Sequence, residues 1–83
     1  MAKTFRLNII TGEKKIYEGD IRSLVAPGGL GYLGILADHA PLLTTLVPGK
    51  ITFKDAAGKT EALDSSTNSF LQVLRNKATI LVE

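Results

Sequence analysis

The chain has no cysteine and no tryptophan, and it has a single histidine among its 83 residues. Without cysteine there can be no disulfide bond and no thiolate metal ligand, which is compatible with a reducing compartment. One histidine cannot build a His-rich zinc site, because such sites take three or four protein ligands. We therefore expect no metal site and no bound cofactor.

Charge of one sign is also scarce, because ten Lys and Arg side chains face eight Asp and Glu, for a net charge of +2. The cations are scattered and form no basic stripe with interleaved aromatics, so we expect no nucleic-acid partner. No apolar run approaches the roughly 20 residues that span a bilayer, and the first residues lack the apolar core of a signal peptide. The chain is predicted to be soluble and not to insert into a membrane.

What the chain does contain is an alternation of apolar and polar residues, which predicts strands. Phe5, Leu7 and Ile9, for example, are separated by polar residues, and no segment shows the spacing of an amphipathic helix. Strands are predicted near residues 4–10, 21–26, 32–36, 42–47, 51–54, 59–63, 70–74 and 78–82. Many short strands at close spacing favour a β-sandwich or small barrel, and the length allows one domain, residues 1–83.

Several predicted strands are apolar on both faces, for example at Ile9–Ile10 and at residues 80–82. One face of an antiparallel sheet normally meets water. An apolar outer face indicates a docked partner, whereas a strand between two layers explains the same pattern without one. Both interpretations stay open at this point.

The segment 28–43 holds four of the eight glycines, the histidine and one of the three prolines. Residues 29–34 match the Gly-x-Gly-x-x-Gly pattern of dinucleotide-binding loops, which requires a helix directly after the loop. Pro41 prevents a helix from continuing past Ala40. The glycines instead indicate a tight loop whose backbone needs positive φ or close approach to another chain.

An enzyme would have to use Asp38 and His39, the one candidate acid–base pair. Neighbouring residues of an extended chain point to opposite faces, so the two are poorly placed to hydrogen-bond. Ser65, Ser66 and Ser69 lie in a polar stretch with no sign of a nucleophile elbow. We expect no catalytic residue, and His39 is interpreted as a structural residue of a loop.

The residues as a whole resemble the N-terminal domain of the epsilon subunit of F-type ATP synthases, called delta in mitochondria. The signature is the segment from Leu33 to Leu43, which is similar to the family's "LGI..xHAPLL" sequence. Matches to the opening strand, to the aromatic-x-Gly step at 17–19, to the "PGxI" turn at 48–51 and to the closing strand pair follow in the family's order.

The resemblance implies a flattened, ten-stranded antiparallel β-sandwich at the foot of a rotating central stalk. It implies a non-catalytic rotor subunit of a proton-translocating ATP synthase that couples the c-ring to the gamma subunit. Such a subunit is peripheral to the cytoplasmic side of a bacterial inner membrane, in a bacterial or photosynthetic source. The residues matching c-ring contacts are Gly29, Leu30, Gly31, Tyr32 and Leu33, and those matching the gamma-facing side are Thr11, His39 and Lys50.

The chain departs from the family in two informative places. An acidic residue is common where Tyr32 stands, so the resemblance implies a packing contact there in place of a charge-assisted one. Most family members continue into a C-terminal helical hairpin, whereas this sequence ends at Glu83, as expected either for a short member or for a truncated chain. A free-standing β-sandwich that binds a small ligand is the alternative, and it would need a concave pocket lined by aromatics.

Overall fold

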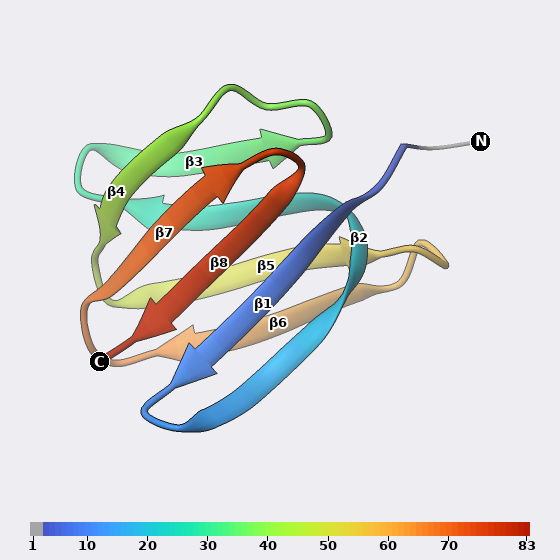
Figure 1. Cartoon of the computed structure of the whole chain (residues 1–83). Helices are drawn as coiled ribbons and strands as arrows, with labels where there is room; N and C mark the ends of the chain where they lie inside the picture. Colours follow the sequence, from blue (N-terminus) through green and yellow to red (C-terminus); the bar gives the residue numbers. More distant parts are fainter. Residues whose placement is uncertain (1–2) are drawn as a thin grey trace.

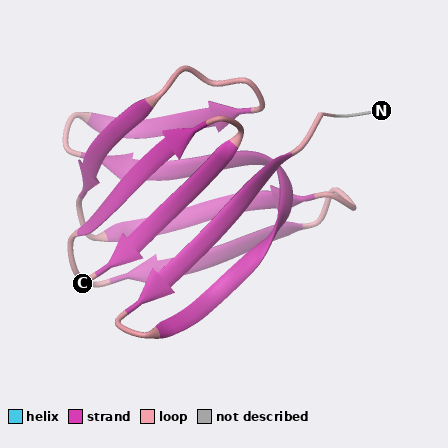
Figure 2. Ribbon diagram, viewed as in Figure 1, coloured by secondary structure: helices cyan, strands magenta, loops and turns pink. Residues whose placement is uncertain are grey.

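The computed structural model describes residues 3–83, which form eight strands joined by turns and loops (Figure 2). No helix occurs in this range. The strands are β1 (Phe5–Thr11), β2 (Lys14–Gly28), β3 (Gly31–Leu36), β4 (Leu42–Leu46), β5 (Gly49–Asp55), β6 (Thr60–Ser65), β7 (Ser69–Leu74) and β8 (Lys77–Val82). The expected all-β class is confirmed.

The strands pack as two layers joined by β2 (Figure 1). The front layer holds β4, β7, β8, β1 and the first half of β2, whereas the back layer holds β3, the second half of β2, β5 and β6. Register shifts interrupt the pairing of β2 with β1 and with β5. Such bulges bend a strand and increase its twist, which lets one 15-residue strand serve both layers.

Two details of the expected sandwich are wrong. The described residues form eight strands, not ten, and one of them, β2, is a continuous strand that both layers share. The sheet is mixed and not purely antiparallel, because β1 pairs with β8 in parallel. These two strands come from opposite ends of the chain and share no hairpin, so no tight turn forces them to run antiparallel.

The second half of β2 extends further than its sequence predicts, because it passes through Pro27 to Gly28. Proline lacks an N–H and normally interrupts a ladder. Here the carbonyl of Pro27 accepts a hydrogen bond of 2.9 Å from the N–H of Val47, just beyond β4. This bond, together with the pairing of Gly28 with Leu46, fastens β4 to the back layer.

The core lies between the layers and consists of alternate residues of the strands. Leu7, Ile9, Ile21, Leu24 and Ile80 are all fully buried. The ring of Tyr17, on β2, packs against the ring of Phe53, on β5, with 4.5 Å between the centroids. The period-two pattern correctly predicts the inward residues Leu7 and Ile9 of β1. It is wrong for β2, because the register shift between Ile21 and Ser23 turns Ile21 and Leu24, three residues apart, to the same inner face.

The strands that are apolar on both faces now divide clearly. Ile9 and Ile80 point into the core, so the two-layer interpretation is correct for them. Leu81 lies on the outer face of the front layer with 49% of its side chain exposed, beside its strand partners Phe70 and Ile10. This outer apolar row, Ile10–Leu81–Phe70, has no cover among residues 3–83, so the docked-partner interpretation stays open there.

Candidate functional site

The turn between β2 and β3 consists of two residues, Gly29 and Leu30, between the paired Gly28 and Gly31. Gly31 has φ +132°, a conformation that L side chains rarely adopt. A Cβ on Gly28 would lie 2.9 Å from the carbonyl oxygen of Gly31. The expected positive φ is therefore confirmed at Gly31. The close approach at Gly28 is to the chain's own backbone, so the expected approach of another chain stays a prediction.

Gly29 differs from its two neighbours. A Cβ built on it would meet no atom of the described chain within 4 Å, and its φ is not in the positive range. The fold itself therefore does not require glycine at this position. Open space around an unsubstituted backbone allows another chain to approach the peptide groups closely.

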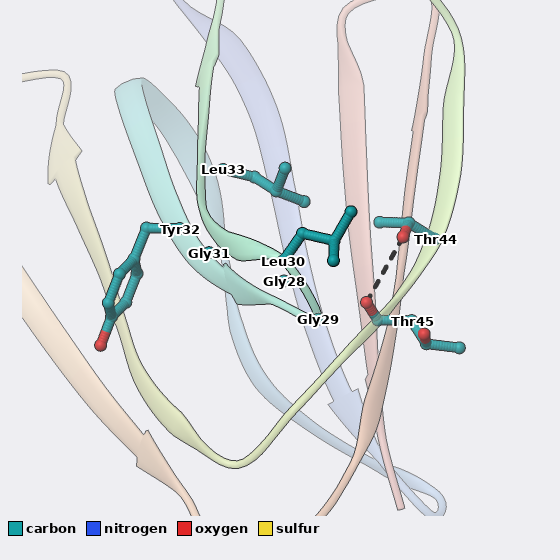
Figure 3. A pocket seen from close by; sticks show the side chains of 8 residues that line it. All are labelled: Gly28, Gly29, Leu30, Gly31, Tyr32, Leu33, Thr44 and Thr45. Atoms are coloured by element: carbon teal, nitrogen blue, oxygen red, sulfur yellow. Dashed lines mark hydrogen bonds between the residues drawn. The ribbon is translucent and has the colours of Figure 1, made fainter.

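The side chains of the hairpin divide between its two sides (Figure 3). Leu30 and Leu33 lie toward Thr44 and Thr45 of β4, whereas Tyr32 points away from them. Leu30 is fully exposed at the tip, and Tyr32 is 65% exposed on the outer face of the back layer. A leucine without any packing in its own chain is a candidate contact for another protein.

A hollow of about 320 Å³ lies between the hairpin and β4 and is the candidate site. Its lining consists of backbone, apolar side chains and hydroxyls, from Gly28, Gly29, Leu30, Gly31, Tyr32, Leu33, Thr44 and Thr45. The hydroxyl of Thr44 donates a hydrogen bond of 3.4 Å to the carbonyl oxygen of Thr45 (Figure 3). All five residues that match c-ring contacts lie here together.

The chemistry of this hollow suits a protein surface better than a reaction or a small ligand. No charged or titratable carboxyl, imidazole or amine lines it, and Tyr32 is its one aromatic residue. Within residues 3–83, no group of three or more His, Asp or Glu side chains is placed to hold a metal ion. The aromatic-lined pocket that a ligand-binding sandwich would need is not found in this hollow.

The three residues that match the gamma-facing side lie on separate elements. Thr11 ends β1 opposite Lys14 and Val82, and Lys50 lies exposed on β5 opposite Asp64. His39 is half-buried in the connection between β3 and β4, where its Nδ1 lies 2.7 Å from the carbonyl oxygen of Ala40. The fold does not bring these three side chains into one cluster.

The sequence predicts that Asp38 and His39 are poorly placed to hydrogen-bond with each other, and the carboxylate of Asp38 indeed has other partners. Its carboxylate accepts hydrogen bonds of 2.7 Å from Lys3 and 2.9 Å from the amide of Asn76, while its own N–H donates to Asn76 Oδ1 at 2.6 Å. Asp38 and Asn76 both have positive φ, at 64° and 59°. We call this set the Asp38–Asn76 link, which joins the β3–β4 connection to the β7–β8 turn.

The Asp38–Asn76 link is expected to weaken in acid. The hydrogen bond from Lys3, and then that from Asn76, lowers the pKa of the Asp38 carboxyl from its ordinary value. A carboxyl whose pKa is lower in the folded chain stabilises it above the unfolded pKa, and this contribution is lost as the pH falls through the folded value. We expect the stability of the chain to decline below about pH 4. The stability of the Asp38→Asn variant should decline less steeply, as measured by thermal unfolding followed by circular dichroism. Identical acid profiles for the two proteins would contradict this role.

Comparisons with known proteins place the chain among ATP synthase subunits. Residues 4–83 match the family described as "ATP synthase, Delta/Epsilon chain, beta-sandwich domain". The chain is 41% identical over 83 residues to the ATP synthase epsilon chain of Desulfosudis oleivorans, covering all of this chain and 62% of that protein. It is 43% identical over 79 residues to that of Pelotomaculum thermopropionicum, covering 95% of this chain and 58% of the other. The chain thus spans about three fifths of the length of these relatives.

Solved structures show the same fold at low sequence identity. A chain of the Euglena gracilis mitochondrial ATP synthase assembly of OSCP, F1 and c-ring superposes with a TM-score of 0.89 at 18% identity, over 95% of this chain and 50% of that one. A chain of the central stalk and c-ring of the Tetrahymena thermophila mitochondrial enzyme superposes with a TM-score of 0.77 at 17% identity, over 98% of this chain and 64% of that one. Within residues 3–83 there is no helix that is long and apolar enough to cross a membrane.

Proposed function

The chain belongs to the family of ATP synthase delta and epsilon chains, whose β-sandwich domain it carries, and from this premise we propose that it is a non-catalytic rotor subunit of a proton-translocating ATP synthase. In this role it lies in the central stalk and couples rotation of the c-ring to the gamma subunit. It is peripheral to the membrane, on the side where the F1 part lies. The structural relative from the Tetrahymena thermophila enzyme belongs to an assembly of central stalk and c-ring, which supports this placement.

The exposed tip of the β2–β3 hairpin is the observation that carries the proposal. Leu30 is fully exposed, and the peptide groups of Gly29 are open to close approach by another chain. We assign this tip, with Gly31, Tyr32 and Leu33, to the polar loops of the c-ring. The hydroxyls of Thr44 and Thr45 at the edge of the hollow add polar groups that suit such loops.

A separate surface must hold the gamma subunit, because torque passes through the chain from one partner to the other. Strand pairing on the front layer places the half-buried Ile10 beside Leu81 and Leu81 beside Phe70, and Leu81 and Phe70 are both exposed, so the outer apolar row Ile10–Leu81–Phe70 is contiguous. Thr11 directly follows this row on β1. We assign the gamma subunit to this row, with Thr11 at its border. His39 and Lys50 also remain proposed gamma contacts, but gamma would have to extend around the sandwich to touch them.

Capture by purified partners tests the proposal. The chain, immobilised through a tag, is offered gamma subunit alone and then gamma together with detergent-solubilised c-ring. We expect gamma to bind with a Kd in the micromolar range or tighter, which corresponds to about −8 kcal/mol. Phe70→Asp should weaken this binding at least tenfold, because a charge buried in an apolar contact loses its hydration.

Lys54→Asp, which changes an exposed side chain of the back layer, is the matched control and should leave gamma binding unchanged. A chain that fails to capture gamma at tens of micromolar would refute the stalk role. Equal binding by Phe70→Asp and the parent chain would keep that role and overturn the choice of face.

A further inference from the structure

The strand β3 forms one edge of the back layer, because among residues 3–83 it pairs with β2 alone (Figure 1). Its pairing also shows which backbone groups are free. Pro27 lies opposite Tyr32, has no N–H, and directs its carbonyl to Val47 on its other side. The pair Pro27–Tyr32 is therefore of the type that exchanges no hydrogen bonds.

Because the two types of pair alternate along an antiparallel ladder, the same holds for the pairs of Gly34 and Leu36. The N–H and C=O groups of Tyr32, Gly34 and Leu36 consequently point to the free edge. The side chains of Tyr32 and Leu36 are 65% and 64% exposed on the outer face. A row of unpaired backbone groups of this kind is a template for another strand.

The absence of charge distinguishes β3 from two of the other edges. The sequence Gly-Tyr-Leu-Gly-Ile-Leu holds no charged residue and no proline. By contrast, β6 holds Glu61 and Asp64, and the first half of β2 holds two lysines and a glutamate, which protect an edge from pairing with its own copy. The uncharged edge of β4 is partly closed, because Leu46 pairs with Gly28 and Val47 bonds to Pro27.

We propose that β3 pairs with β3 of a second copy of this chain, antiparallel and about a two-fold axis at Gly34. In this register Gly34 faces Gly34 of the partner, Tyr32 faces Leu36, and Leu33 faces Ile35. Residues of the same face meet in every pair, and the three residues with free backbone groups meet one another, as an antiparallel ladder requires. No other register pairs all three of them.

Gly34 suits the position on the axis, where two identical side chains would otherwise meet. A Cβ on Gly34 would touch nothing within 4 Å in the single chain, and its φ is not positive, so the fold itself does not demand glycine there. The pairing also covers the exposed Tyr32 and Leu36 and extends the core over the half-buried Leu33. This inference concerns the free chain and does not depend on the proposed stalk role.

Sedimentation equilibrium of the 83-residue chain tests the pairing. A single strand pair is a small interface, so the average mass should rise from 8.9 kDa at about 10 µM toward twice that value at about 1 mM. Gly34→Lys places two like charges opposite each other and should weaken the dimer at least tenfold. Ala62→Lys is the matched control, because it adds the same charge on the same outer face, on β6, away from the axis.

A second measurement uses the absence of cysteine in the chain. Gly34→Cys provides one thiol per copy, which a short bis-maleimide should join into a covalent dimer, whereas Ala62→Cys should stay monomeric under the same conditions. Circular dichroism confirms that each variant is folded. A mass that stays at 8.9 kDa at 1 mM, or equal association of the two lysine variants, would overturn the pairing. Capture of gamma by the same preparations tests the stalk role separately, so a failure of the pairing can be distinguished from a failure of that role.

Discussion

Leu30→Asp is expected to weaken attachment of the chain, bound to gamma, to the c-ring by at least tenfold and to leave the chain folded. Leu30 is fully exposed at the tip of the β2–β3 hairpin, so no contact within the chain is lost. Burying a leucine at an interface contributes about 1.5–3 kcal/mol, and a carboxylate in its place would also lose hydration. A loss of 1.4 kcal/mol is a factor of ten in Kd.

The measurement is capture of detergent-solubilised c-ring by the immobilised complex of the chain with gamma. Leu43→Asp is the control, because Leu43 is 74% exposed on β4 and lies outside the hairpin. It should retain c-ring capture while its circular dichroism matches that of the parent. If Leu30→Asp captures the c-ring as well as the control does, the hairpin tip is not the contact, and the assignment of residues 29–33 is wrong.

Gly29→Ala and Gly28→Ala sharpen this assignment because they differ by one position. A Cβ at Gly29 has open space, whereas a Cβ at Gly28 approaches the backbone oxygen of Gly31 to 2.9 Å. The first variant should change only attachment, and the second should change the hairpin itself. The fold thus requires glycine at position 28, whereas a contact with a partner would explain the glycine at position 29.

The sequence predicts the short strands well where polar and apolar residues alternate strictly, as in β7, whose burial alternates at every residue. It does not predict the first half of β2, where Lys14, Lys15 and Glu18 are exposed and only Tyr17 gives an inward signal. Nor does it predict that β1 and β8 run parallel, because strand pairing between the chain ends leaves no local mark.

The candidate site divides in the same way. The turn at Gly29 and Leu30 is a local feature that glycine and the preceding proline indicate. Thr44 and Thr45 join the hollow only because β4 is fastened to β2 at Gly28, a contact between segments far apart in the sequence. The Asp38–Asn76 link also joins segments far apart in the sequence. Asp and Asn tolerate positive φ, so each residue alone indicates a turn at its own position, but not the contact between the two turns.

Leu24→Ala is expected to remove a large share of the folding stability, because Leu24 lies fully buried at the centre of the back layer. Its strand partners are Ile35 on β3 and Phe53 on β5, so the lost side chain leaves a cavity beneath the hairpin strand. Such truncations cost about 2–5 kcal/mol. A chain of 83 residues has a free energy of unfolding of only about 4–12 kcal/mol at typical values per residue.

Urea unfolding followed by circular dichroism measures this loss, with Leu43→Ala as the matched control. Leu43 is 74% exposed, so the same truncation there should change the free energy of unfolding by less than about 0.5 kcal/mol. The midpoint of Leu24→Ala should fall with an unchanged slope, since the surface exposed on unfolding is nearly the same. A loss no larger than that of the control would mean that β3 is not held by the core. The hairpin would then be too loosely supported to transmit torque, so this stability measurement also tests the premise on which the c-ring contact depends.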